Sequence, residues 1–232
     1  TEVIRAAQDN NLYVFGAVAD QHELAPDTVL SSFVLDMEKA FDMAYTMTNE
    51  GKFRGEVFKP GVETGPGGPG DGIVYLAPFY QLEDRVPLDV KDRFNMIVLD
   101  IQEGKLVIPE THEFTPAGMS TLSVAAAAEG VTKVALVTDA LFSDQGWGLN
   151  AFNAANALKE KYGFELGLAE SVNIPDIEST LRDFAERDYD LIIAHGFQWS
   201  GPAIVVGEDY PDTKFVVFTG FSSSPNVASI FP

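Results

Sequence analysis

Residues 133–147 read Lys-Val-Ala-Leu-Val-Thr-Asp-Ala-Leu-Phe-Ser-Asp-Gln-Gly-Trp. The apolar, partly β-branched run at 133–138 predicts a buried strand, and a polar loop follows it from Asp139 to Trp147. A strand followed by such a loop is typical of an open α/β sheet, in which ligands bind outside the carboxyl ends of the strands. We therefore expect Asp139 and Trp147 to lie at a ligand-binding edge of the sheet.

The same alternation of short apolar runs and amphipathic stretches continues to the C-terminus. Further strands are expected at residues 164–169, 190–194, 214–219 and 227–231. Helices are expected at residues 149–161 and 176–187 and from Ser200 onward. Short connections between such elements imply right-handed crossovers and a parallel sheet, which gives an α/β fold class.

The N-terminal half has weaker but similar signals. Strands are expected at residues 12–19, 29–34 and 73–76, with a further extended piece at 105–108. Helices are expected after Asp36, ending at Gly51, and after Pro87. Residues 61–72 are rich in Gly and Pro and predict a loop, whereas the alanine-rich run at 120–128 fits either a linker or the tail of a signal peptide.

Composition narrows the class of protein. The apolar fraction of 46% in 232 residues is sufficient for a hydrophobic core. A formal charge of −20 disfavours nucleic acid and anionic membranes as partners, and the acidity fits either adaptation to high salt or simple solubility. The chain has no cysteine, so it forms neither disulfides nor thiolate metal sites. No apolar run approaches the roughly twenty residues of a membrane span.

Common catalytic and cofactor motifs are absent. No Gly-x-Gly-x-x-Gly motif follows a predicted strand, and the chain contains neither a Walker phosphate loop nor a Gly-x-Ser-x-Gly nucleophile elbow. Its histidines, His22, His112 and His195, do not have metal-ligand spacing. We therefore expect no metal, no cofactor and no catalytic residue.

Several residues that follow predicted strands suit a small-molecule site, and each also has a structural interpretation. Asp139 and Asp20 suit ligand binding or the capping of a turn or helix. Trp147 and Trp199 suit stacking on a flat ligand or packing in a core. His195 suits ligand contact or a hydrogen bond to a backbone carbonyl, and the second is favoured. The full set of candidate ligand-binding residues is Asp139, Asp144, Gln145, Trp147, His195, Phe197, Trp199, Asp20 and Gln21.

These motifs resemble the basic membrane protein family of extracytoplasmic substrate-binding proteins of ABC transporters, which includes nucleoside-binding lipoproteins. Residues 131–232 resemble its N-terminal half, through Val-Thr-Asp at 137–139, Ala-His-Gly-Phe at 194–197, Tyr-Pro-Asp-Thr at 210–213 and Pro-Asn-Val at 225–227. The earlier residues resemble its C-terminal portion, through Phe-Gly-Ala-Val-Ala-Asp-Gln at 15–21, Leu-Ala-Pro-Asp at 24–27 and Gly-Ile-Val-Tyr-Leu-Ala-Pro at 72–78.

The resemblance implies an unusual organisation of domains. The two halves occur in reversed order, and much of the family's second lobe is absent. Residues 1–118 would be the family's C-terminal portion, residues 119–130 a linker or signal-like tail, and residues 131–232 the N-terminal α/β lobe. The implied fold is of the periplasmic-binding-protein type I, in which two α/β lobes enclose a ligand, here with an incomplete second lobe.

The resemblance also implies roles for particular residues. Asp139 matches an acid that meets the base or sugar of a nucleoside, Trp147 stands where the family has a stacking Phe, and Phe197 lies at the pocket wall. Thr219 and Val18 replace acids that hold ribose hydroxyls, and Leu35 replaces a basic residue. These replacements favour a nucleobase or another flat ligand with few polar groups, with Asp20 as a compensating acid.

The implied function is that of an extracytoplasmic solute-binding protein that delivers a nucleoside, purine base or similar planar solute to an ABC permease, without catalysis. Two other classes stay open. One is an enzyme on a Rossmann-like sheet with Asp139 and His195 as acid and base. The other is an interaction module that binds no ligand.

Overall fold

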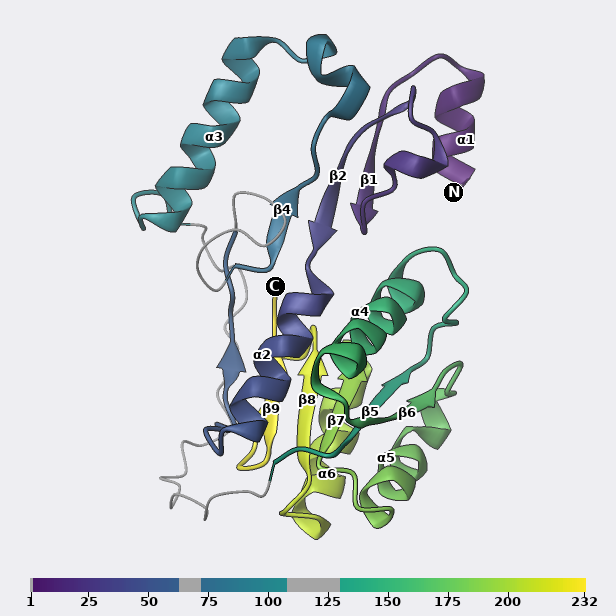
Figure 1. The fold of residues 1–232 in the computed structure, drawn as a ribbon, viewed down its shortest axis with the longest axis vertical. Coiled ribbons are helices and arrows are strands. Elements are labelled where there is room, and N and C mark those ends of the chain that lie inside the picture. The colour runs from purple at the N-terminus through teal and green to yellow at the C-terminus, as the bar shows by residue number, and fades with distance from the viewer. Residues whose placement is uncertain (1, 63–71, 108–129) are drawn as a thin grey trace. The chain divides into compact units, whose positions relative to one another are not determined.

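The structure is a computed structural model and describes residues 2–62, 72–107 and 130–232 (Figure 1). The chain divides into two compact units. Unit 1 comprises Thr1–Asp36 and Pro60–His112, and unit 2 comprises Met37–Lys59 and Glu113–Pro232. Among the described residues, no helix has the length and apolar character required to cross a membrane.

Unit 2 contains a parallel sheet whose strands are ordered β3-β9-β8-β7-β5-β6. Its strands are β3 (Val57–Phe58), β5 (Lys133–Thr138), β6 (Glu165–Ala169), β7 (Leu191–His195), β8 (Lys214–Phe218) and β9 (Val227–Ile230). Along the chain, β5 leads outward to β6 on one side, whereas β7, β8 and β9 follow on the other. The direction of the strand order therefore reverses between β5 and β7, which is the switch point where ligands bind in open α/β sheets.

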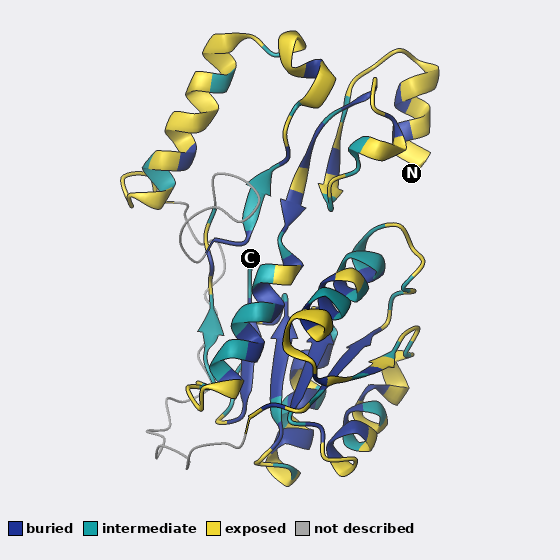
Figure 2. Ribbon diagram, viewed as in Figure 1, coloured by how far each residue is buried: buried dark blue, intermediate teal, exposed yellow. Residues whose placement is uncertain are grey.

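Helices cover both faces of this sheet. They are α2 (Met37–Asn49), α4 (Trp147–Tyr162), α5 (Ile177–Glu186) and α6 (Ser200–Asp209), with short 3-10 helices at η3 (Ile174–Asp176) and η4 (Phe197–Trp199). On one face, α5 and α6 pack on alternate strand residues such as Val137, Ala194 and Val217. His195 and Phe218 have the opposite parity and contact Phe41 of α2. Both faces are therefore buried, and Figure 2 shows the central strands as buried.

Helix α2 brings a distant segment of the chain into unit 2. The carboxylate of Asp42 accepts hydrogen bonds from Lys161 Nζ at 2.8 Å and from Tyr162 Oη at 2.7 Å, both at the end of α4. Beyond α2, β3 pairs in parallel with β9 through Val57 and Ser229. Residues 37–59 thus pack with residues 130–232, whereas the sequence-based division grouped them with residues 1–118.

Unit 1 contains a small sheet of order β1-β2-β4, in which β1 and β2 are parallel and β4 is antiparallel. Its elements are α1 (Glu2–Asp9), β1 (Val14–Val18), η1 (His22–Leu24), β2 (Val29–Leu35), β4 (Val74–Leu76), η2 (Tyr80–Arg85) and α3 (Leu88–Gln102). Most of helix α3 is exposed (Figure 2). Most of its apolar residues are among the exposed ones, whereas Val98 is buried. The described part of unit 1 therefore has a much smaller core than unit 2.

The structure confirms the expected α/β class and the strands of residues 133–232, with ends shifted by one or two residues. The expectation of an extended piece at 105–108 is wrong for residues 105–107, which form no strand. Sequence patterning missed β3, which is very short, and the 3-10 helices. The predicted glycine-rich loop falls largely, and the alanine-rich run entirely, outside the described residues.

Asn226 is a polar anchor in the core of unit 2. Its side-chain nitrogen lies within hydrogen-bond distance of three carbonyl oxygens, at 3.1 Å from Gly207, 3.0 Å from Tyr210 and 2.9 Å from Thr213. The residue is buried and joins the loop before β9 to the end of α6 and to the start of β8. A donor is therefore required at this position.

We expect Asn226→Asp to lower the free energy of unfolding by about 3 kcal/mol or more, because a carboxylate would face three carbonyl oxygens and donate to none. Urea unfolding followed by circular dichroism measures the change. The same substitution at the exposed Asn153 is the control and should change stability by less than about 0.5 kcal/mol. Equal effects of the two substitutions would contradict the anchoring role of Asn226.

Candidate functional site

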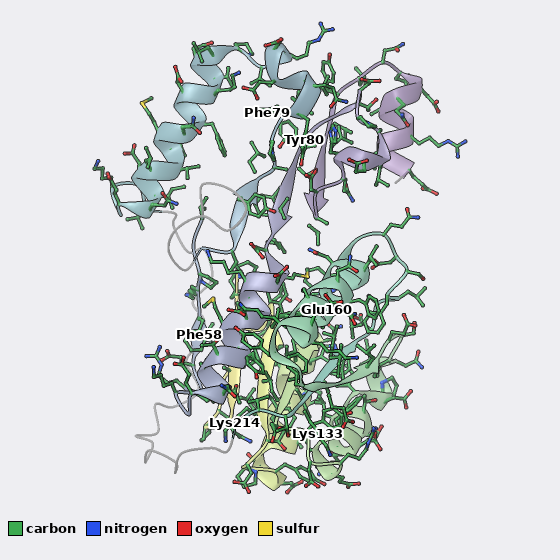
Figure 3. The ribbon with its side chains drawn as sticks, viewed as in Figure 1. Phe58, Phe79, Tyr80, Lys133, Glu160 and Lys214 are labelled. Carbon is green, nitrogen blue, oxygen red and sulfur yellow. The ribbon has the colours of Figure 1, made fainter. Side chains whose placement is uncertain are left out.

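The candidate site lies at the carboxyl ends of β5 and β7, on either side of the switch point. Thr138, the last residue of β5, connects the two strands: its Oγ1 donates to the carbonyl oxygen of His195 at 3.3 Å and accepts from the backbone N–H of Ala140 at 3.1 Å. The turn that contains Asp139 is thereby held against the end of β7. Lys133 and Lys214 begin β5 and β8, at the opposite end of the sheet (Figure 3).

The Asp139 side chain is exposed, and within residues 2–62, 72–107 and 130–232 its carboxylate has no hydrogen-bond or ion-pair partner. The alternative considered for Asp139, a helix or turn cap, is therefore not the role that it has in this structure. A carboxylate with free acceptor atoms at a strand end is available to an N–H group of a ligand.

Asp144 caps helix α4. Its carboxylate accepts hydrogen bonds from the backbone N–H groups of Gly146 and Gly148, both at 2.8 Å, and of Leu149 at 3.1 Å. Partial burial acts to raise the pKa of Asp144, but the three backbone hydrogen bonds outweigh it, with a smaller effect from His195, and the pKa is lowered. Asp144 therefore orders the loop, and its acceptor atoms are occupied by the helix.

The rest of this loop is also well defined. The backbone N–H of Phe142 donates to the carboxylate of Glu170, which follows β6. Gln145 has a left-handed backbone with a φ of 58°, and its side chain is exposed. Sequence analysis identified Gln145 but missed Glu170, for which the only signal is an acid directly after a predicted strand.

Trp147 is the first residue of α4 and is packed on one side. Its ring stacks on the ring of His195, with centroids 3.9 Å apart and planes at 22°, and its centroid is 5.8 Å from that of Phe218. The residue is only partly buried. Trp147 therefore combines a ring orientation fixed by His195 with partial exposure of the residue.

His195 is fully buried beneath Trp147. Its Nε2 lies 3.2 Å from the carbonyl oxygen of Trp147, so Nε2 carries the hydrogen and donates it. Burial lowers the pKa of His195 to about 3, against the opposing effects of this hydrogen bond and of Asp144. The hydrogen bond to a backbone carbonyl is the structural role favoured from the sequence, and the neutral ring is inaccessible to solvent.

The two aromatic residues after β7 differ in exposure. Phe197 begins η4 and is 62% exposed, so it is available at the edge of the sheet. Trp199 was expected as a possible exposed ring, but it is fully buried in the core with α5 and α6. The turn of η4 directs residue 199 inward, and Trp199 is therefore a packing residue in this structure.

Asp20 and Gln21 follow β1 in unit 1. The Asp20 carboxylate accepts hydrogen bonds from the Tyr80 hydroxyl, from the backbone N–H of His22 at 3.1 Å and from Ser32 Oγ at 3.4 Å. Gln21 donates its backbone N–H to Ser32 Oγ at 3.0 Å. Sequence analysis did not identify Tyr80, although an aromatic residue soon after the predicted strand 73–76 was a usable signal.

The buried imidazole makes stability depend on pH. Because the pKa of His195 is about 3 in the folded protein and near 6.5 when unfolded, the unfolded chain binds an extra proton between these values. The free energy of unfolding therefore decreases as the pH falls from 6.5 towards 3, with a contribution of up to about 1.4 kcal/mol per pH unit.

We expect His195→Phe to remove this contribution. Urea unfolding of both proteins between pH 3.5 and 7 should show the free energy of unfolding of the unchanged protein decreasing relative to that of His195→Phe as the pH falls. A difference that stays constant over this range would contradict a buried neutral imidazole at position 195.

A sequence model of the family described as "ABC transporter substrate-binding protein PnrA-like" matches residues 131–231. The transcriptional activator protein med of Bacillus subtilis is 29% identical over 101 residues, which are 43% of this chain and 32% of that protein. Basic membrane protein A of Borreliella burgdorferi is 30% identical over 101 residues, which are 43% of this chain and 30% of that protein. The chain thus spans about a third of the length of these relatives.

Among solved structures, an ABC transporter solute-binding protein from Conexibacter woesei aligns with a TM-score of 0.36 and 28% identity, over 38% of this chain and 29% of that one. The residues that the sequence model matches contain β5 to β9 and α4 to α6, whereas β3 and α2 lie outside the match. Residues 131–231 of this chain are thus similar to the PnrA-like substrate-binding proteins of ABC transporters and to basic membrane protein A.

Proposed function

We propose that the chain acts in an extracytoplasmic solute-binding protein that delivers a flat heterocyclic solute, a purine base or nucleoside, to an ABC permease. The observation that supports this most directly is that Trp147, which is only partly buried, and Asp139, whose carboxylate has no partner among the described residues, lie at the two ends of one loop at the switch point. The family match of residues 131–231 supports the solute-binding class.

In this proposal the ring of Trp147 stacks on the solute, and Asp139 accepts a hydrogen bond from a ring or amino N–H. The stack on His195 fixes the orientation of the indole before the ligand binds, which reduces the entropy lost on binding. Phe197 adds apolar contact from the end of β7.

The enzyme alternative receives less support from this geometry. A general acid or base must reach the ligand, whereas His195 is fully buried and its Nε2 is bonded to a backbone carbonyl. Incubation of the protein with adenosine or inosine, followed by chromatography, should return the nucleoside unchanged. Recovery of free base would support the enzyme instead.

We expect adenine, hypoxanthine, xanthine, adenosine or inosine to change tryptophan fluorescence and to release heat in calorimetric titration. Trp147→Ala should weaken the affinity roughly ten- to hundredfold, because base stacking on an aromatic side chain contributes about 1–3 kcal/mol. Asp139→Asn should weaken it about tenfold through the loss of a charge-assisted hydrogen bond.

The matched control is Asp212→Asn, which removes one negative charge from the exposed loop before β8, at the other end of the sheet. Its affinity should equal that of the unchanged protein. If none of the five compounds binds, the proposal fails. If one binds but Trp147→Ala and Asp139→Asn have no effect, the ligand lies elsewhere and this site is wrong.

A further inference from the structure

The loop after β6 is bonded to the segment of unit 2 that carries Asp139. The backbone N–H of Val172 donates to the carbonyl oxygen of Thr138 at 3.1 Å, and the backbone N–H of Ser171 donates to the carbonyl oxygen of Ala140 at 3.0 Å. These two acceptors belong to the residues directly before and after Asp139. The backbone on both sides of Asp139 is therefore attached to the neighbouring loop.

Glu170 makes a further contact between the two loops, and it does so with its side chain. Its carboxylate accepts a hydrogen bond from the backbone N–H of Phe142. Phe142 is also attached to helix α4, because its ring lies against that of Phe152, with centroids 5.0 Å apart and planes at 33°. Glu170 thus bonds to the residue through which the loop after β5 packs on α4.

Both loops also contain a residue with a left-handed backbone. Ser171 has a φ of 54°, and Gln145 has a φ of 58°. Such conformations are uncommon for residues other than glycine and persist where the surrounding structure maintains them. The first turn of α4 is packed closely on the same loop, since a Cβ at Gly148 would lie 2.2 Å from the carbonyl oxygen of Leu141. The path of this loop therefore depends on contacts with both β6 and α4.

We propose that Glu170 is a positioning residue that, through Phe142, holds the loop after β5 in the conformation that presents Asp139 to the solute. This inference rests on the proposed function, which it extends by a residue that sequence analysis did not identify. A carboxylate that is held in place before the solute binds loses less conformational entropy on binding. The indole of Trp147 is held separately, by its stack on His195. Glu170 therefore affects affinity through Asp139.

The first measurement requires no ligand. Hydrogen exchange of the Phe142 amide, followed by NMR on the intact chain, should become about three- to tenfold faster in Glu170→Ala, because the amide loses its acceptor. Glu170→Gln keeps an acceptor oxygen and should retain most of the protection. The control is Glu160→Ala, which removes an exposed carboxylate at the other end of α4 and should leave this exchange unchanged (Figure 3).

The second measurement is titration with the bases and nucleosides named above. Glu170→Ala should weaken the affinity about three- to tenfold, whereas Glu170→Gln and Glu160→Ala should bind nearly as the unchanged protein does. Added to Asp139→Asn, Glu170→Ala should cause no further loss, because a positioning residue acts only through the group it orients. Added to Trp147→Ala, it should cause its full loss, because the indole is held independently of Glu170.

The outcomes separate this inference from the proposed function. If the unchanged protein binds none of the compounds, both fail. If it binds but Glu170→Ala keeps full affinity, with or without faster exchange of the Phe142 amide, Glu170 is merely structural and the inference alone fails. Equal losses in Glu170→Gln and Glu170→Ala, or a further loss on top of Asp139→Asn, would indicate that Glu170 contacts the solute itself. Either result would overturn the positioning role and leave the proposed function intact.

Discussion

The hydrogen bond from His195 Nε2 to the carbonyl oxygen of Trp147 joins the end of a central strand to the first residue of helix α4. This bond, the ring stack beside it and the Asp144 cap together determine where α4 begins. The start of α4 in turn determines the place of the indole and the length of the loop that carries Asp139. The arrangement at the switch point therefore depends on a histidine that solvent does not reach.

Burial of that histidine has a cost that the surrounding groups offset only in part. Its Nδ1 is buried and has no hydrogen-bond partner among the described residues, which destabilises the folded state. The neutral ring avoids the larger cost of a buried charge, and its flat surface supports Trp147. A leucine of similar volume would fill the space but would not orient the indole or bind its carbonyl group.

The parallel sheet of unit 2 was predictable from the sequence. Strands that are buried on both faces are short continuous apolar runs, and the segments between them have apolar residues at helical spacing. The same pattern predicted where the strands end, and hence the region of the candidate site. It did not predict the roles of individual side chains. Asp139 and Asp144 are both acids in one loop, and only the position of the first turn of α4 decides which of them caps the helix.

The burial of Trp199 and the packing of residues 37–59 with unit 2 depend on contacts that cannot be predicted from the neighbouring sequence. Trp199 is buried because the 3-10 turn η4 changes the direction of the chain after β7, which no periodicity in so short a segment indicates. Residues 37–59 join unit 2 through the bonds of Asp42 to α4 and the pairing of β3 with β9, across more than a hundred residues of sequence. The contact between Tyr80 and Asp20 is of the same long-range kind.

The charged residues in the loops at the switch point limit which ligands can bind there. The loops after β5, β6, β7 and β8, residues 139–146, 170–173, 196 and 219–226, contain Asp139, Asp144 and Glu170 but no lysine or arginine. A phosphate at this edge would meet carboxylates without a cationic side chain from these loops, and the N-terminus of α4 is already occupied by Asp144. An uncharged base, whose N–H groups donate to a carboxylate, avoids this repulsion. The charges of these loops therefore disfavour an anionic ligand at this edge of the sheet.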